Sequence, residues 1–109
     1  MTYQDILRFS AITIRNVFAD ADMPIIGIYL FGSRSRGDYQ PESDWDFLVC
    51  CKNDLPFSQK ATLSGKIQTL LAEKMISADI IIKSKRNVLE EQKNVGIITF
   101  YAIKDGIPV

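Results

Sequence analysis

A strongly apolar segment, a polar connection and a second apolar segment follow one another in the first half of this chain. The first is Ile25–Phe31, with the sequence IIGIYLF, and its β-branched and aromatic residues predict a buried strand. The second is residues 44–51, DWDFLVCC, which we also expect to form a strand. The residues between them are polar and contain glycine and proline, so they predict a surface connection. The rest of the fold has to be built around this pair of strands.

Segments with helical periodicity precede and follow the strand pair. Thr2 and Asp5 have a spacing like that of a capping box, and Leu7, Ala11, Ile14 and Phe18 then recur at steps of four, three and four. We predict a second helix over about residues 58–75, in which one face is formed by Leu63, Ile67, Leu70, Leu71 and Met75. Both helices are therefore amphipathic and can cover a sheet.

The second half of the chain predicts a third strand at residues 78–82, with the sequence ADIII. Apolar residues between 88 and 102 then favour helix, with a break near Asn94 or Gly96. Residues 107–109 follow Gly106 as a short edge strand or tail. This order predicts an α+β (or α/β) chain, a small mixed β-sheet flanked by helices, and its 109 residues suit a single domain, residues 1–109.

Charge and composition exclude several classes of protein. Thirteen Lys and Arg residues balance thirteen Asp and Glu residues, so no uniform basic field favours general nucleic-acid binding. Without His, the chain cannot use His-ligated zinc or haem, or an imidazole base. Its two cysteines are adjacent, no apolar run reaches the roughly 18 residues of a membrane span, and the first residues lack a signal peptide's apolar block. We therefore expect a cytoplasmic protein that does not enter membranes.

The polar connection begins with residues suited to phosphate binding. Gly32 and Ser33 come directly after the first strand, where a glycine lets the backbone approach an anion closely and the hydroxyl and N–H groups act as donors. Arg34 and Arg36 lie beside them, so we predict that these four residues bind a nucleoside triphosphate. A Gly-Ser step is also a common turn, and surface arginines are ordinary, which is the structural alternative.

Carboxylates follow ten residues later. Asp44 and Asp46 are two positions apart, so on a strand both point to one face, and oxygen ligands held in this way suit Mg²⁺. Asp79 opens the third strand, and beside the second strand it would join the pair, hold a second metal ion or accept a proton. The alternatives are a solvated strand edge for the first two and a simple helix stop for Asp79.

Together these residues resemble a known family. The stretch LFGSRSRGDYQPESDWDFLV, residues 30–49, is similar to the signature of the minimal nucleotidyltransferases within the DNA-polymerase-β-like nucleotidyltransferase superfamily. Residues 78–80 and 102–109 are similar to later parts of that family's pattern. The resemblance implies a polymerase-β-like palm in which Gly32 and Ser33 hold the triphosphate and Asp44 and Asp46 bind Mg²⁺. It also implies that Asp79 completes a two-metal site and helps to activate the acceptor.

The resemblance further implies a reaction and a partner. The expected reaction transfers AMP from ATP to a hydroxyl group and releases pyrophosphate. Small members of this family are typically antitoxins whose partner is a HEPN-type ribonuclease toxin, which they inactivate by adenylylating a tyrosine. Two alternatives stay open: a binding module that neutralises its partner by occlusion without catalysis, and a transferase for small molecules.

Apolar residues on both faces of the first and third strands independently favour a partner. A small sheet with about three helices leaves apolar surface uncovered, which suits a partner protein or a homo-oligomer. The alternative is that the helices cover both faces of the sheet.

Overall fold

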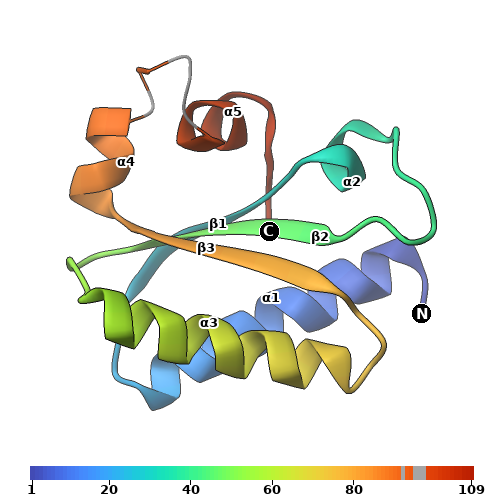
Figure 1. The fold of residues 1–109 in the computed structure, drawn as a ribbon, viewed down its shortest axis with the longest axis horizontal. Helices are drawn as coiled ribbons and strands as arrows, with labels where there is room; N and C mark the ends of the chain where they lie inside the picture. The colour runs from blue at the N-terminus through green and yellow to red at the C-terminus, as the bar shows by residue number, and fades with distance from the viewer. Residues whose placement is uncertain (92, 95–97) are drawn as a thin grey trace.

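The computed structural model describes residues 1–91, 93–94 and 98–109 (Figure 1). In these residues the elements are α1 (Tyr3–Asp20), β1 (Ile25–Phe31), α2 (Ser33–Arg36), β2 (Trp45–Cys51), α3 (Phe57–Ala72), β3 (Ala78–Ser84), α4 (Lys85–Glu91), α5 (Ile98–Asp105) and β4 (Ile107–Pro108). The predicted α+β order is confirmed. The additional element is α2, a short helix inside the surface connection that was predicted between the first two strands.

The four strands form one mixed sheet in the order β3-β2-β1-β4. β1 runs antiparallel to β2 and to β4, whereas β2 and β3 are parallel. A parallel neighbour requires a crossover, and α3 supplies it between β2 and β3. In this register Asp46 of β2 lies opposite Phe31 of β1 on one side and Asp79 of β3 on the other.

Helices lie on both faces of the sheet, as Figure 1 shows, with α1 and α3 on one face and α2, α4 and α5 on the other. This is the alternative arrangement considered from the sequence, in which helices lie on both faces of the sheet. The main core lies beneath α1 and α3, and its fully buried side chains include Ile14, Phe18, Phe47, Ile67 and Leu71. Alternation along β2 directs Phe47 into this core and places Asp46 on the opposite face.

The start of α1 has a side-chain cap, whereas the start of α3, after Pro56, has no side-chain cap hydrogen bond. The capping box of α1 is confirmed: the Asp5 N–H donates to Thr2 Oγ1 and the Thr2 N–H donates to Asp5 Oδ2, each at 3.1 Å. The prediction that α3 reaches Met75 is wrong, because the helix ends at Ala72 and the Met75 side chain is 94% exposed.

A Schellman motif explains the early end of α3. Met75 adopts a left-handed conformation with φ 62°, its N–H donates to the Ala72 carbonyl, and the Ile76 N–H donates to the Leu71 carbonyl. Ile76 is only 3% exposed, so it takes the buried position that was expected for Met75. The apolar pair of Leu71 and Ile76 that accompanies this motif turns the chain toward β3.

The C-terminal part agrees with the predicted helix and edge strand. Two helices, α4 (Lys85–Glu91) and α5 (Ile98–Asp105), lie within the described residues of this part, and β4 pairs with β1 at the edge of the sheet. Gly96, one of the two positions expected to break the helix, lies outside the described residues. Among the helices of the described residues, none combines the length and apolarity needed to cross a membrane.

Both outer edges of the sheet are covered or short. On β3, the carbonyls of Ala78 and Ile80 accept hydrogen bonds from Gln68 Nε2 of α3 at 2.9 Å and from Ser64 Oγ of α3 at 3.4 Å. On the other edge β4 has two residues, and one of them is Pro108, which has no N–H. Side chains of α3 therefore bond to the exposed side of the longer edge strand.

Candidate active site

Gly32 stands where β1 turns into α2, and its conformation requires glycine. Its φ of 74° and ψ of −162° lie in a region essentially restricted to glycine. A Cβ atom at this position would also overlap Oδ2 of Asp46 and lie 3.2 Å from Asp46 Cγ. The backbone of the first predicted phosphate-binding residue is therefore in direct contact with the carboxylate of a predicted metal ligand.

The next residues form a single tight helical turn. The N–H groups of Ser35 and Arg36 both donate to the Gly32 carbonyl, at 3.1 and 3.3 Å, and Ser35 Oγ donates to it at 2.7 Å. Gly37 ends this turn with φ 86°. The Ser33 hydroxyl makes no side-chain hydrogen bond within the described residues, and the side chain is half-buried. Gly32 thus brings the backbone against the Asp46 carboxylate, and phosphate binding by Gly32 and Ser33 stays a prediction.

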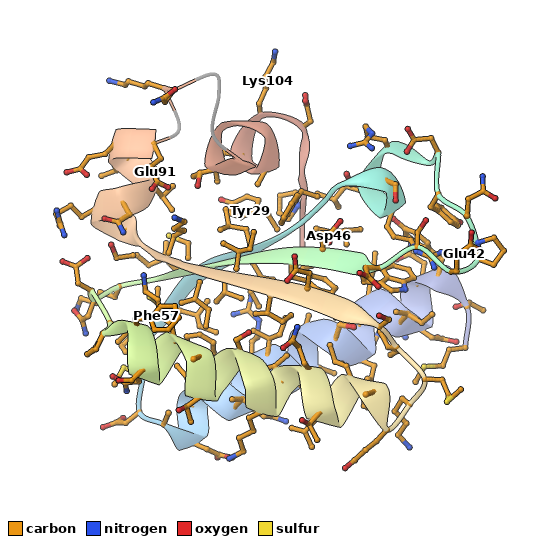
Figure 2. The ribbon with its side chains drawn as sticks, in the orientation of Figure 1. Tyr29, Glu42, Asp46, Phe57, Glu91 and Lys104 are labelled. Carbon is orange, nitrogen blue, oxygen red and sulfur yellow. The ribbon has the colours of Figure 1, made fainter. Side chains whose placement is uncertain are left out.

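The three predicted carboxylates lie at one end of β2 and β3. Asp46 and Asp79 are direct partners across the parallel strands, and Asp44 immediately precedes β2. Figure 2 labels Asp46 on the face of the sheet that carries α2 and α5. Burial raises the pKa of Asp46, the negative charges of Asp79 and Asp44 raise it further, and the Arg36 guanidinium opposes them. The site therefore concentrates negative charge that favours a bound proton or a cation.

Asp44 has a fixed contact that the sequence did not indicate. Its Oδ1 accepts a hydrogen bond of 2.6 Å from Ser77 Oγ, in the turn before β3. Within the described parts of the chain, no group of three or more Asp, Glu, Cys or His side chains is arranged to hold a metal ion. Asp46 and Asp79 are neighbours across the strands, but the two-metal arrangement that includes Asp79 stays a prediction.

The two predicted arginines lie in different environments. Arg36 is exposed, and its Nε donates to Asp38 Oδ2 at 3.3 Å. Arg34 is half-buried, and its guanidinium donates to the carbonyls of Pro41 and Ser43. Arg36 therefore adds positive charge near Asp46, whereas Arg34 binds the connection between α2 and β2.

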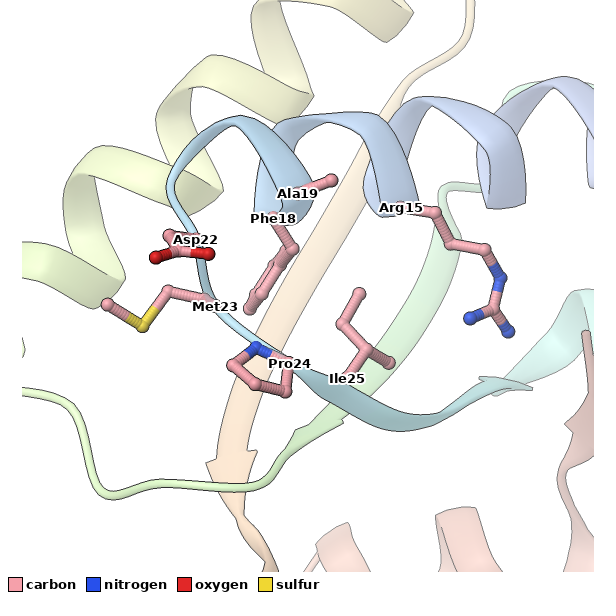
Figure 3. Close-up of a pocket in the computed structure, with 7 residues that line it drawn as sticks. All are labelled: Arg15, Phe18, Ala19, Asp22, Met23, Pro24 and Ile25. Carbon is pink, nitrogen blue, oxygen red and sulfur yellow. The ribbon is translucent and has the colours of Figure 1, made fainter.

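A separate hollow lies between the end of α1 and the start of β1 (Figure 3). It has a volume of about 370 Å³ and is lined by Arg15, Phe18, Ala19, Asp22, Met23, Pro24 and Ile25. None of the predicted site residues belongs to this lining, and the hollow lies at the opposite end of β1 from Gly32. The carboxylate site and this hollow are therefore distinct features.

The family described as polymerase beta, nucleotidyltransferase, matches residues 13–104, which include all the predicted site residues. The chain belongs to this family. No curated protein matches the sequence at a significant level.

Solved structures have the same fold at low sequence identity. A toxin–antitoxin structure with AMP-PNP matches with a TM-score of 0.55 and 22% identity, covering 88% of this chain and 68% of that one. The toxin–antitoxin MntA–HpeT, in a variant with two aspartates replaced by glutamate, matches with a TM-score of 0.53 and 18% identity over 99% of this chain and 72% of that one. A Tyr-to-Ala variant of MntA–HpeT matches with a TM-score of 0.52 and 22% identity over 88% of this chain and 68% of that one. These likenesses support the nucleotidyltransferase fold.

Proposed function

We propose that this nucleotidyltransferase transfers AMP from ATP to a hydroxyl group of a protein partner, with Mg²⁺ and with release of pyrophosphate. The observation that carries the proposal is the placement of Asp46, which is paired with Asp79 across β2 and β3 and in contact with Gly32. Membership of the family supports the reaction class.

The donor set fits magnesium. Carboxylate oxygens are the ligands that Mg²⁺ prefers, and the ion commonly completes its shell with substrate phosphates and water. The charges of Asp79 and Asp44 raise the pKa of Asp46, so both repel the Asp46 carboxylate, and a divalent cation would relieve that repulsion. Asp44 and Asp46 would hold the ion, with Asp79 completing the site. When bound, Mg²⁺ would neutralise charge that develops on the phosphates.

The reaction then needs positioning and one proton acceptor. Gly32 and Ser33 would bind the triphosphate through backbone N–H groups and the Ser33 hydroxyl, and Arg36 would add positive charge. The acceptor oxygen forms a bond to the α-phosphorus, the bond from that phosphorus to the bridging oxygen breaks, and pyrophosphate leaves. Asp79, exposed at the start of β3, would take the proton of the acceptor hydroxyl.

The structural neighbours favour a toxin as the partner. We propose a HEPN-type toxin whose tyrosine hydroxyl is the acceptor, because three neighbours are toxin–antitoxin structures and one is described with AMP-PNP. Neutralisation by occlusion alone is the second candidate, since the same neighbours are also assemblies.

Label transfer tests the proposal. We expect ATP labelled at the α-phosphate to label the product of the neighbouring gene in the presence of Mg²⁺, and chelation of the metal to stop it. Asp44→Asn and Asp46→Asn should each abolish labelling, whereas Glu42→Gln, an exposed carboxylate in the same connection, should label like wild type. Labelling that persists in Asp46→Asn would refute the assignment of the site. If Asp46→Asn transfers no label but still neutralises its toxin partner fully, occlusion is favoured.

A further inference from the structure

Arg34 lies at the centre of a cluster that joins three distant parts of the chain. Its guanidinium carbon is 4.4 Å from the centre of the Tyr39 ring and 4.6 Å from that of Trp45. Tyr3 of α1 packs against the same two rings, with centroid distances of 6.0 Å to Tyr39 and 5.0 Å to Trp45. The Tyr3 hydroxyl also donates to the backbone carbonyl of Arg34 at 2.7 Å. We name these four residues the Arg34 cluster.

The Arg34 guanidinium forms hydrogen bonds with the backbone immediately before Asp44. Nε and Nη2 of Arg34 both donate to the Ser43 carbonyl, at 3.2 and 2.9 Å, and Nη2 also donates to the Pro41 carbonyl at 3.1 Å. Ser43 precedes Asp44 directly, and its Oγ accepts a hydrogen bond of 2.9 Å from the Gln40 N–H. The last residues of the connection are thereby fixed to α2.

The other side of Asp44 is fixed to β3. The backbone N–H of Trp45, a member of the Arg34 cluster, donates to the Ser77 carbonyl at 2.9 Å. The Ser77 hydroxyl in turn donates to the Asp44 carboxylate. Trp45 is 4% exposed, and the next residue is Asp46. The cluster therefore determines where the chain enters β2, and with it the backbone positions of both carboxylates.

We propose that Arg34 is a positioning residue: through Ser43 and Trp45 it sets the Asp44 and Asp46 carboxylates for Mg²⁺, and it does not bind the nucleotide phosphates. This differs from the expectation drawn from the sequence, which grouped Arg34 with the phosphate-binding residues. The inference rests on the proposed function for the role of the carboxylates, whereas the cluster itself stands on the contacts above.

The chemistry of arginine explains why this position needs that side chain. A planar guanidinium donates two bonds to one carbonyl while its faces contact aromatic rings, and a lysine ammonium supplies neither geometry. Lys at this position keeps the positive charge but loses the paired N–H donors of the planar guanidinium. A direct phosphate contact would support ATP binding with and without Mg²⁺, whereas a positioning role acts only when the metal is bound, so metal-free ATP binding by the Arg34 variants separates the two roles.

The experiment uses the only tryptophan of the chain, Trp45, as its reporter. Quenching of Trp45 fluorescence by acrylamide and amide hydrogen exchange of residues 38–44 report the cluster, and calorimetric titration of ATP with and without Mg²⁺ reports the site. The proteins are wild type, Arg34→Lys, Arg34→Ala and the control Arg8→Ala, which removes an exposed arginine of α1. Circular dichroism confirms that each variant is folded.

We expect Arg34→Lys to behave like Arg34→Ala. In both, Trp45 quenching and exchange of residues 38–44 should rise, and ATP binding with Mg²⁺ should weaken by about tenfold, the loss of one geometrically specific contact. ATP binding without Mg²⁺ should change by less than about twofold, and Arg8→Ala should match wild type. Wild-type quenching and exchange in Arg34→Lys would overturn the proposal. Metal-free ATP binding that is clearly weaker in Arg34→Ala than in wild type would also overturn it. If wild type binds no ATP, the proposed function fails, and quenching and exchange still decide whether the cluster holds the connection.

Discussion

Replacing Gly32 by alanine tests whether backbone conformation and a carboxylate compete for the same space. Two separate effects follow from the structure. The backbone at φ 74° and ψ −162° is unfavourable for any residue with a Cβ, at a cost of about 1–3 kcal/mol. The added Cβ also overlaps Asp46 Oδ2, so this carboxylate has to leave its rotamer, which costs about 0.5–1.5 kcal/mol more.

The sum, about 1.5–4.5 kcal/mol, is large for a domain of this size. Each kcal/mol lowers the melting temperature of a domain of 60–100 residues by roughly 4–8 °C, so we expect Gly32→Ala to lower it by at least roughly 6 °C. Thermal unfolding followed by circular dichroism measures this change. ATP titration of the folded variant should show lost binding, because Asp46 is displaced from Gly32.

Two other glycines provide matched controls. Gly37 has a positive φ of 86° and open space around its Cβ position, so Gly37→Ala should cost only the backbone term of about 1–2 kcal/mol. Gly65 is exposed within α3 with nothing near its Cβ position, so Gly65→Ala should stabilise the fold by about 0.5–1 kcal/mol.

A double variant separates the two effects at Gly32. In an Asp46→Ala background the Oδ2 overlap is gone, and Gly32→Ala should cost the backbone term alone. A coupling energy of about 0.5–1.5 kcal/mol between the two sites is therefore expected. Strict additivity, or a Gly32→Ala variant as stable as Gly37→Ala, would refute the reasoning.

Two further predictions concern stability. Burial, with the charges of Asp79 and Asp44, raises the pKa of Asp46 in the folded chain, so the folded state loses stability as pH rises above the ordinary value for Asp. Without metal, Asp46→Asn should thus be more stable than wild type at neutral pH, by about 0.2–1 kcal/mol for the removal of one like-charge cross-strand pair. This difference in stability should shrink as the pH falls and Asp46 becomes protonated. Thermal unfolding across a range of pH checks this, and a difference that stays constant with pH would contradict it. Met75→Gly should stabilise the fold by about 0.5–1 kcal/mol, because Met75 is left-handed and its side chain is 94% exposed. Chemical unfolding measures this gain, with Lys74→Gly as the expected destabilising neighbour, and an unchanged midpoint for Met75→Gly would contradict it.

The strands and their site-bearing ends could be predicted because local patterns dominate there. Ile25–Phe31 is a strand with the expected bounds, and the third strand lies beside the second, so that Asp79 is next to Asp46. These features depend on residues close together in the sequence and on a strand period of two.

The misplaced end of α3 has a different origin. Gly and Asn are the usual residues in the left-handed position of a Schellman motif, and here that position holds Met75. Continued apolar periodicity therefore pointed beyond the true end of the helix. Burial of Ile76 against Leu71 decides where the helix ends, and only the tertiary structure shows this burial.

Long-range polar contacts were likewise hidden in the sequence. Ser77 is 33 positions from Asp44, and Tyr3 is 31 positions from Arg34. Serine after a helix and tyrosine near an N-terminus carry no local signal of such partners. The parallel crossover and the docking of α1 create these contacts, so they become visible only once the fold is known.

The hydrogen bonds from α3 to the outer carbonyls of β3 bear on how copies of this protein behave beside one another. Sheet polymerisation begins when an edge strand offers free backbone groups to another chain. Here Gln68 and Ser64 already bond to two of these carbonyls, and the opposite edge ends at Pro108. Edge-to-edge aggregation is thereby disfavoured even at the high local concentrations that a crowded cell produces.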